Sequence, residues 1–386
     1  MSTHCILLTG ANGYIASHIL SLLLASPAKH SIRAVVRSQS KVDDVKAILP
    51  DASTSQLEFA VVPDMTTPGA FDEALKSNPP FDIVMHTASP FKYSEAGCPA
   101  DFIDPAVKGT TEILAGIQRV APSSVKRVIL TGSFAAVGAW GLRDERNKVY
   151  TVSQIPNTRT PCLMSLDLSI PLLSTIAELT PAPAPQEEDW FPATNEDVEK
   201  NTTNKNFLYL ASKLFAERAA WEAQKGPDVA WDLVAINPVI VYGPLLQRIQ
   251  SLDHVNESMG IIWNRFLNGK TPEDEVPANG VPLYVDVRDV ADAHILALDN
   301  PDAANQRFIL AAGLLDSQKI ADILHAEVPG AQERVPKGTP GKNTFPDDQW
   351  RADNSKVQKV LGLKFRSVEE TIADSGKQLL ELERTL

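Results

Sequence analysis

A tyrosine and a lysine in the middle of the chain have the spacing of a helical acid–base pair. Tyr209 and Lys213 lie four positions apart in the stretch YLASKLFAERAAW, so a helix would place the phenol and the ammonium on one face. A phenol with an ordinary pKa of about 10 exchanges its proton poorly near pH 7, but a neighbouring ammonium favours the phenolate. We therefore expect Lys213 to lower the pKa of Tyr209, which would act as a general acid or base. The alternative is an ordinary pair of surface residues, because this spacing often arises by chance.

A serine upstream is the third candidate for this chemistry. Ser133 follows an apolar run over residues 125–131 that predicts a strand, and it precedes Tyr209 by 76 positions. Open parallel sheets bind their ligands beyond the carboxyl ends of the strands. The Ser133 hydroxyl would there hold a substrate oxygen beside Tyr209. The predicted catalytic set is therefore Ser133, Tyr209 and Lys213.

A glycine loop near the N-terminus predicts a phosphate-binding turn. Gly10-x-x-Gly13-x-x-Ala16 follows an apolar run over residues 5–9 and precedes a helical pattern of leucines. In a strand–turn–helix unit the first glycine allows the tight turn and the second lets the backbone approach a pyrophosphate. The small third residue allows the helix to pack on the strand. The helix N-terminus then meets the phosphates. The alternative is a glycine-rich turn that binds nothing.

The end of the second expected strand selects the dinucleotide. A site for NAD would carry an acidic residue there to accept the ribose hydroxyls. The chain instead reads VVRSQSK, and Arg37 and Lys41 are suited to a 2′-phosphate through charge-assisted hydrogen bonds. The interpretation is an NADPH site, against the alternative of two solvated surface cations. Lys213 would then also hydrogen-bond the nicotinamide ribose.

Further cofactor contacts are expected along the same sheet edge. Asp64, after the third strand, is placed either to touch the adenine or to serve as an ordinary turn aspartate. His86 ends the fourth strand and is assigned no chemistry. The remaining expected cofactor contacts are Asn12, Tyr14, Ile15, Thr87, Ala88, Ser89, Pro238 and Val239, together with Tyr209 and Lys213.

Apolar strands alternating with helices predict an α/β fold. Strands are expected at residues 5–9, 31–36, 57–62, 81–86, 125–131, 231–241 and 307–311. Helices are expected at residues 41–49, 104–120, 208–223, 287–299 and 368–383. Strands that are apolar throughout indicate a parallel sheet covered on both faces, a Rossmann-type doubly wound sheet. We expect a dinucleotide-binding domain at 1–243 and 283–310, and a smaller, non-contiguous substrate-binding lobe at 244–282 and 311–386.

Composition limits the partners. The 386 residues carry a formal net charge of −12, which argues against nucleic acid or an anionic membrane as a partner. Three cysteines without CxxC spacing favour a reducing compartment. No stretch predicts a signal peptide or a membrane span. We expect a soluble, cytoplasmic monomer or homodimer that acts on a small molecule and holds no metal.

Several stretches together resemble one family. They are TGANGYIASH, VVRSQSK, VVPD, VMHTASPF, PAVKGT, ILTGSFAAV, YLASKLFAERAAW, INPVIVYGP and YVDVRDVADAH. The sequence looks like an extended short-chain dehydrogenase/reductase, in the branch of plant dihydroflavonol reductases and fungal methylglyoxal/isovaleraldehyde reductases and related ketoreductases. The resemblance implies the same catalytic set, the NADPH site, and a mainly apolar substrate pocket flanked by Phe91, Phe134 and Tyr242. Gly132 departs from the pattern, since relatives often carry a second serine there, and this leaves Ser133 as the only candidate.

The expected activity is reduction of an aldehyde or ketone by hydride transfer from NADPH, with Tyr209 protonating the oxygen. One alternative is a nucleotide-sugar epimerase or dehydratase, but residues 244–282 lack a polar and basic cluster for a diphosphate. The other is a catalytically impaired NADP-binding protein.

A 35-residue stretch keeps that second alternative open, since it lies between Ser133 and Tyr209. Residues 152–186 hold six prolines and no glycine, and without them the serine-to-tyrosine spacing would fall from 76 to 41. A surface loop is expected here, because long unstructured loops are uncommon inside compact domains. Codons for Val152-Ser153 and Gln186 can carry intron ends, so one hypothesis is a translated intron and the other a cap over the active site. Transcripts that always contain the stretch would exclude the intron.

Overall fold

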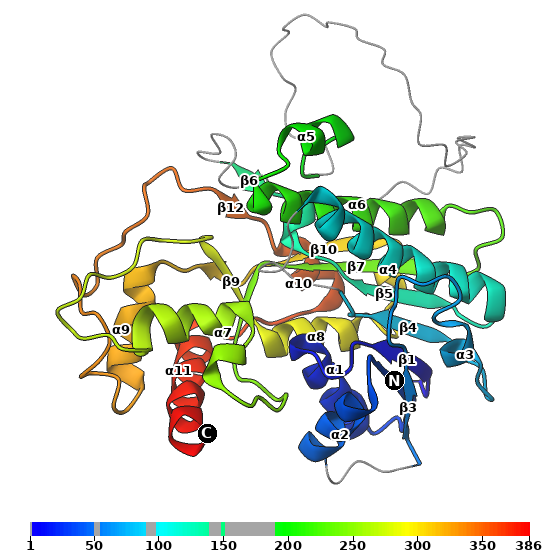
Figure 1. Ribbon diagram of the computed structural model, residues 1–386, viewed down its shortest axis with the longest axis horizontal. Helices are drawn as coiled ribbons and strands as arrows, with labels where there is room; N and C mark the ends of the chain where they lie inside the picture. The colour runs from blue at the N-terminus through cyan, green and yellow to red at the C-terminus, as the bar shows by residue number, and fades with distance from the viewer. Residues whose placement is uncertain (1, 50–54, 90–97, 139–147, 151–189) are drawn as a thin grey trace, which may run out of the picture.

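Short runs of β-branched and aliphatic residues form a seven-stranded parallel sheet, as the sequence predicts. The computed structural model describes residues 2–49, 55–89, 98–138, 148–150 and 190–386. The strand order is β10-β7-β5-β4-β1-β2-β3, with the first strand of the chain in the interior of the sheet (Figure 1). The strands are β1 (Cys5–Thr9), β2 (Ser31–Val36), β3 (Leu57–Val61), β4 (Ile83–His86), β5 (Arg127–Thr131), β7 (Asp232–Pro238) and β10 (Gln306–Leu310).

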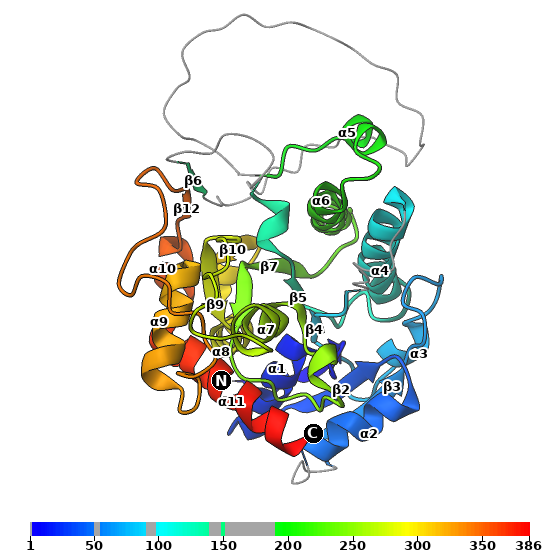
Figure 2. The same cartoon turned by 60° about the vertical axis from the view of Figure 1, so that its left-hand side comes forward.

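Helices cover both faces of this sheet, which makes it doubly wound. Ile6 and Leu8 of β1 face one hydrophobic core, and Leu7 between them faces the other, because side chains alternate along a strand. One face packs against α1 (Tyr14–Ala25), α2 (Gln39–Ile48) and α8 (Val287–Leu296). The opposite face packs against α3 (Asp72–Leu75), α4 (Pro99–Val120) and α6 (Lys205–Gln224). Figures 1 and 2 show these two layers on either side of the strands. The predicted fold class is confirmed.

Helix α4 begins earlier than the sequence analysis expected. The prediction started it at residue 104, but the helix runs from Pro99 with Pro105 inside it. Pro99 occupies the first turn, where a missing N–H costs nothing. Cys98 and Asp101 form a capping box that fixes this start.

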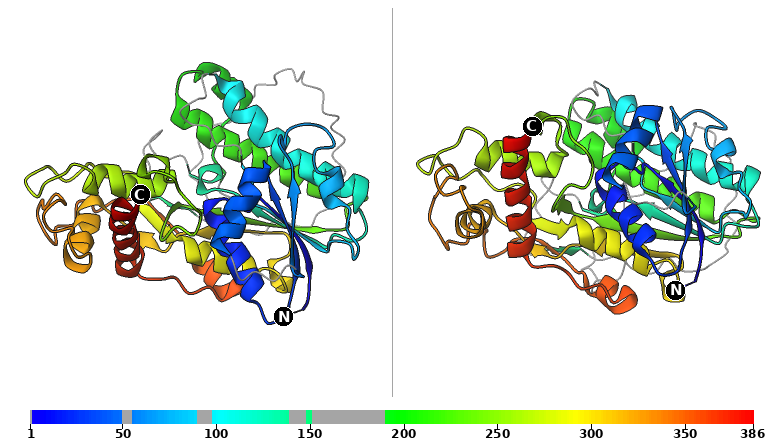
Figure 3. Two further views of the ribbon diagram at one scale, coloured as in Figure 1. Left: turned by 60° about the horizontal axis from the view of Figure 1, so that its bottom comes forward. Right: turned by 90° about the horizontal axis from the view of Figure 1, so that it is seen from below.

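A second hydrophobic core lies beside the sheet. The elements that build it form the left-hand end of the molecule in both views of Figure 3. It is built on a three-stranded sheet and on helices from the last third of the chain. The strands are β8 (Ile240–Tyr242), β9 (Leu283–Asp286) and β11 (Gly313–Leu314). The helices are α7 (Glu257–Ile262), the π-helical turn η3 (Trp263–Leu267), α9 (Ser317–Glu327) and α11 (Val368–Thr385). We call this unit the substrate lobe, after the role that the sequence analysis predicts for it.

One part of the chain lies elsewhere than expected. The sequence analysis placed all of 311–386 in the substrate lobe, but α10 (Ser355–Leu361) packs against β10. Val357, Leu361 and Leu363 are buried in the core of the large sheet. The sequence analysis expected no helix here, and an apolar pattern cannot indicate which core receives it.

The remaining elements flank the stretch that the sequence analysis singled out. β6 (Val149–Tyr150) pairs with β12 (Arg351–Ala352), and α5 (Asn195–Lys200) precedes α6. The expected loop over residues 152–186 and the pocket residue Phe91 lie outside the described residues. Among the helices that are described, none combines the length and apolarity needed to cross a membrane.

Candidate active site

The carboxyl ends of four strands meet at one edge of the large sheet. The register pairs Thr9 with His86, His86 with Leu130, and Thr131 with Ile236, so β1, β4, β5 and β7 end level with one another. The loops that follow these strands carry most of the predicted site residues. They are Gly10, Asn12, Gly13, Thr87, Ala88, Ser89, Ser133, Pro238 and Val239.

The turn after β1 requires its glycines. Gly10 has a φ of +67°, and a Cβ atom there would lie 3.0 Å from Cα of Ala88. The N–H of Gly13 donates to the carbonyl of Gly10 at 2.8 Å, and a Cβ atom on Gly13 would lie 3.0 Å from that same oxygen. Any side chain at either position would open the turn.

The start of α1 offers donors without acceptors. Gly13 is the N-cap and supplies no side-chain cap. The backbone amides of Tyr14, Ile15 and Ala16 occupy the first turn, where a helix has no internal partners, and they have no acceptor in the described part of the chain. The helix dipole adds positive potential at this end. The turn therefore fits a pyrophosphate.

The two predicted phosphate-binding cations after β2 differ in whether they already have a charged partner. Arg37 is exposed and makes no hydrogen bond or ion pair with the described residues. Lys41 pairs with Asp44 one turn later, at 2.7 Å. Ser38 and Ser40 share a hydrogen bond of 2.9 Å at the start of α2. Arg37 is thus available to an anionic ligand, whereas Lys41 would have to leave a carboxylate.

Asp64 adopts one of its two expected roles. It lies exposed after β3 and accepts from the amide of Thr66 at 2.9 Å and from its hydroxyl at 2.7 Å. These hydrogen bonds lower the pKa of Asp64. They are those of a turn aspartate.

The end of β4 is held by Thr9. The Thr9 hydroxyl lies 2.9 Å from Nδ1 of His86 and accepts the amide of Ala88 at 3.1 Å, and the Thr87 hydroxyl donates to the Thr9 carbonyl. Burial lowers the pKa of His86 to about 4, so its ring is neutral near pH 7. Through Thr9, His86 supports the loop at Thr87–Ser89.

Helix α6 delivers the catalytic pair to this edge. It begins at the cap Asn204, whose side chain accepts from the amide of Phe207 at 3.1 Å. Its apolar side packs against α4 along most of both helices. Tyr209 and Lys213 lie on one side of the helix, with the Lys213 ammonium 5.7 Å from the centroid of the Tyr209 ring.

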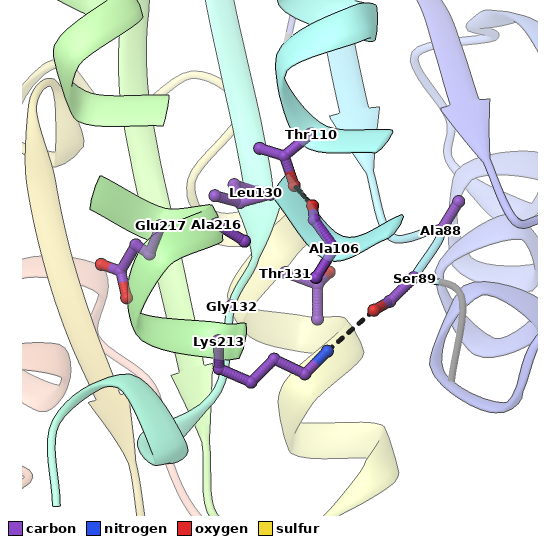
Figure 4. A pocket seen from close by; sticks show the side chains of 10 residues that line it. All are labelled: Ala88, Ser89, Ala106, Thr110, Leu130, Thr131, Gly132, Lys213, Ala216 and Glu217. Carbon is purple, nitrogen blue, oxygen red and sulfur yellow. Dashed lines mark hydrogen bonds between the residues drawn. The ribbon is translucent and has the colours of Figure 1, made fainter. Parts of the chain in front are cut away.

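The structure brings the three predicted catalytic residues together. Ser133 and Tyr209 share a side-chain hydrogen bond. Ser133 is itself fixed as the N-cap of the turn η1 (Phe134–Ala136), where its hydroxyl accepts the amide of Ala135 at 3.1 Å. On the other side, Nζ of Lys213 donates to Oγ of Ser89 at 2.8 Å (Figure 4). One hydroxyl and one ammonium therefore flank the phenol at the strand edge.

The electrostatics of the pair differ from the expectation. The sequence analysis expected Lys213 to lower the pKa of Tyr209, but burial raises this pKa, and the hydrogen bond with Ser133 opposes the rise only in part. Burial also lowers the pKa of Lys213 to about 8. Desolvation penalises both charged forms, and it is the larger effect here. Tyr209 therefore keeps its proton near pH 7, the state that a proton donor needs.

A pocket opens behind Lys213, between the strand ends and helices α4 and α6 (Figure 4). Its polar wall includes Ser89, Thr131 and Glu217. Gly132 forms another wall, and a Cβ atom there would lie 2.1 Å from Oδ1 of Asn237. That oxygen is buried and has no partner in the described part of the chain. The Asn237 amide thus takes the space in which a serine side chain at position 132 would stand.

A buried ion pair lies under the same helix, and sequence reasoning missed it. Glu217 and Arg307 are 1% and 0% exposed, and their side chains approach to 2.7 Å. Trp190 stacks on the guanidinium of Arg307 at 3.5 Å, and the indole N–H of Trp221 donates to Glu217 at 3.2 Å. Glu217 lies eight positions after Tyr209 and Arg307 lies in a distant, mostly apolar strand, so no local sequence pattern indicates that they pair. The charged residue at the start of β10 was the only available hint.

The predicted pocket residues that the structure describes are both buried. Phe134 stacks on Trp350 with ring centroids 5.9 Å apart, inside the core of the large sheet. Tyr242 lies in the core of the substrate lobe, where burial raises the pKa of its phenol. Their role in substrate binding stays a prediction. In the described ranges, no three His, Cys, Asp or Glu side chains are grouped as a metal site would require.

Comparison with known proteins identifies the class. A sequence profile described as the NAD dependent epimerase/dehydratase family matches residues 6–165 and 173–312. The chain belongs to this family. It is 34% identical over 384 residues to the NADPH-dependent methylglyoxal reductase GRE2 of Saccharomyces cerevisiae, covering 98% of each chain. It is also 34% identical over 376 residues to the ketoreductase azaE of Aspergillus niger, covering 97% of each.

Solved structures agree with this placement. The yeast methylglyoxal/isovaleraldehyde reductase Gre2, complexed with NADPH, superposes with a TM-score of 0.80 at 31% identity and covers 99% of this chain and 100% of its own. Vestitone reductase from alfalfa shares the fold, with a TM-score of 0.68 at 19% identity over 99% of both chains. The resemblance to the reductase branch of the extended short-chain dehydrogenase/reductases is confirmed.

Proposed function

We propose that this protein is an NADPH-dependent carbonyl reductase that converts an aldehyde or ketone to an alcohol. The observation that carries the proposal is the meeting of Ser133, Tyr209 and Lys213 at the strand edge that also holds the glycine turn. Reduction of a carbonyl with a bound hydride donor requires the protein to supply a proton donor. Here a hydroxyl orients that donor and a cation lies beside it. Relatives named NADPH-dependent methylglyoxal reductase and ketoreductase support it.

The residues of this chain fit NADPH. The glycine turn and the free amides of α1 would hold the pyrophosphate, Arg37 the 2′-phosphate, and Lys213 the nicotinamide ribose. When bound, the cofactor supplies the hydride. Tyr209 donates its proton to the carbonyl oxygen, and Ser133 fixes the phenol and the oxygen through its hydroxyl. The raised pKa of Tyr209 holds this proton in place until the oxygen becomes basic.

The location of the protein in the cell and its oligomeric state are also proposals. We propose a cytoplasmic protein, because Cys5 and Cys98 are free thiols in the described part of the chain. We also propose that it works as a monomer or homodimer on small molecules, without nucleic acid or membrane partners.

The test of the function is oxidation of NADPH in the presence of a panel of aldehydes, diketones and β-keto esters, with NADH as control. We expect carbonyl-dependent loss of absorbance at the nicotinamide band with NADPH and formation of the alcohol. No turnover with any carbonyl, from a folded protein that binds NADPH, would refute a reductase and favour the catalytically impaired NADP-binding protein.

Reversing the charge of Arg37 is expected to remove the preference for NADPH. Arg37→Glu should weaken NADPH binding roughly 10- to 100-fold, as for lost hydrogen bonds to a charged group, and NADH binding much less. Binding is measured by fluorescence titration of both nucleotides. Lys126→Glu is the matched control, since it makes the same charge change at the opposite edge of the sheet, next to the amino end of β5. An unchanged ratio of the two affinities in Arg37→Glu would exclude Arg37 from the site.

A further inference from the structure

The backbone and the side chain of Tyr14, the first residue of α1, lie at two different sites. Its backbone amide lies at the phosphate-binding end of the helix, but the Tyr14 phenol points to the substrate lobe and donates to the carbonyl of Gly243 at 2.7 Å. Burial raises the pKa of Tyr14, so the phenol stays a neutral donor. The ring packs with the apolar core of the lobe. Tyr14 was expected only among the cofactor contacts, and the structure gives its side chain a different partner.

One helical turn later, His18 repeats this contact on the next residue of the same segment. Its Nε2 lies 2.8 Å from the carbonyl of Pro244. A carbonyl only accepts, so Nε2 carries the proton, and burial lowers the pKa of His18 so that the ring is neutral. The rings of Tyr14 and His18 meet edge to face, with centroids 6.2 Å apart. The i, i+4 pair thus binds two consecutive carbonyls.

The segment that they bind, residues 243–245, leads from β8 to the rest of the substrate lobe, and we call it the crossing. Gly243 has a φ of +123°, and a Cβ atom there would lie 2.9 Å from the side chain of Val287. Residues 243–245 make no backbone–backbone hydrogen bond within the described part of the chain. Helix α11 binds it from the other side. Ser375 accepts the amide of Gly243 at 3.0 Å, and Gln378 bonds both the amide and the carbonyl of Leu245, at 2.6 and 2.8 Å.

Side chains therefore satisfy every backbone polar group of residues 243–245, given that proline has no N–H. Two of these five hydrogen bonds come from α1, which starts at the cofactor turn, and three come from α11 of the lobe. Tyr242 and the chain that follows it build the lobe from this point. Any shift of the start of α1 must move the carbonyls to which it is bonded.

We propose that Tyr14 and His18 are positioning residues that couple the cofactor turn to the substrate lobe. A nucleotide bound on the amides of α1 orders the start of the helix, and the two side chains pass that order to the crossing at Gly243–Leu245. The coupling rests on the proposed function, because it takes the cofactor turn as the NADPH site. By linkage, a ligand in the lobe tightens NADPH through the same two hydrogen bonds.

The test compares Tyr14→Phe with Tyr284→Phe. The first removes one hydroxyl from the coupling pair. The second removes a hydroxyl from the same lobe, one that makes no hydrogen bond in the described part of the chain. Hydrogen–deuterium exchange is measured over residues 240–248, with and without NADPH. We expect NADPH to protect this peptide in the parent protein and in Tyr284→Phe, and the added protection to fall at least about threefold in Tyr14→Phe, as for the loss of one hydrogen bond. His18→Leu should behave as Tyr14→Phe does.

In steady-state kinetics, we expect the loss of the Tyr14 hydroxyl to affect the carbonyl substrate more than NADPH. Tyr14→Phe should raise KM for the carbonyl roughly 3- to 10-fold, while the Kd for NADPH without carbonyl stays within about twofold. Equal losses in both constants, or full protection of the peptide in Tyr14→Phe, would overturn the coupling. If the parent protein binds no NADPH, the proposed function itself fails. If it binds NADPH but gains no protection in the peptide, only the coupling fails.

Discussion

Replacing Tyr209 with phenylalanine is expected to lower kcat for carbonyl reduction by about 10²- to 10⁴-fold, the usual contribution of a positioned acid. The change removes the hydroxyl that is bonded to Ser133 and keeps the ring, which packs against an apolar cluster that includes Phe102 and Phe191. The protein should therefore fold normally. NADPH binding should change little, because Lys213, Arg37 and the glycine turn are untouched. Single-turnover reduction under saturating NADPH measures the loss directly.

Tyr284→Phe is the matched control for this experiment as well, with turnover expected to match that of the parent. If Tyr209→Phe retains more than about a tenth of the parent kcat, Tyr209 is not the acid, since even a modest general acid contributes more. If the loss appears in NADPH binding instead, Tyr209 has only a structural role at the cofactor site.

Removing the positive half of the buried ion pair is expected to cause the largest loss of stability. Arg307→Leu would leave the Glu217 carboxylate buried and uncompensated, because both side chains are almost completely enclosed. Such a charge lowers the free energy of unfolding by about 3–5 kcal/mol. It would also remove the guanidinium that stacks on Trp190. Urea titration followed by circular dichroism measures the change.

The double variant Glu217→Leu with Arg307→Leu separates the charge from the packing. It should recover much of the lost free energy, because no unpaired charge remains. Lys200→Ala is the surface control, because its partner Glu196 is as exposed as Lys200 itself and water screens such pairs, so the free energy of unfolding should hardly change. An Arg307→Leu protein as stable as the parent would show that Glu217 takes up a proton or is reached by water.

The sequence was sufficient for features that depend on local pattern. Apolar strands, the glycine turn and the helical spacing of Tyr209 and Lys213 predicted the doubly wound sheet and the edge at which the site lies. Each follows from steric rules that act over a few residues. The order of residues along the chain then placed Ser133 on the same edge, because parallel strands all end on one side.

Features that depend on the three-dimensional surroundings of a residue could not be predicted from the sequence. The sign of the change in the pKa of Tyr209 is set by burial, which spacing does not reveal. The partner of Glu217 lies 90 positions away, and the hydroxyl of Tyr14 reaches a carbonyl 229 positions away. Lys41 was predicted to face a phosphate but is held by Asp44 on its own helix. The contacts of Glu217 and Tyr14 depend on how distant elements pack, which one sequence does not record, whereas the Lys41–Asp44 pair is local and its i, i+3 spacing could have been read from the sequence.

Helix α6 carries Tyr209, Lys213 and Glu217 at successive turns, and this shared position ties the durability of the catalyst to that of its scaffold. The helix cannot separate from the strand edge without breaking the buried ion pair of Glu217 with Arg307, two turns after Tyr209. Heat should therefore destroy reductase turnover and secondary structure in one event, over the same range of temperature. Variants selected only because they keep their activity after heating would then also have a higher free energy of unfolding.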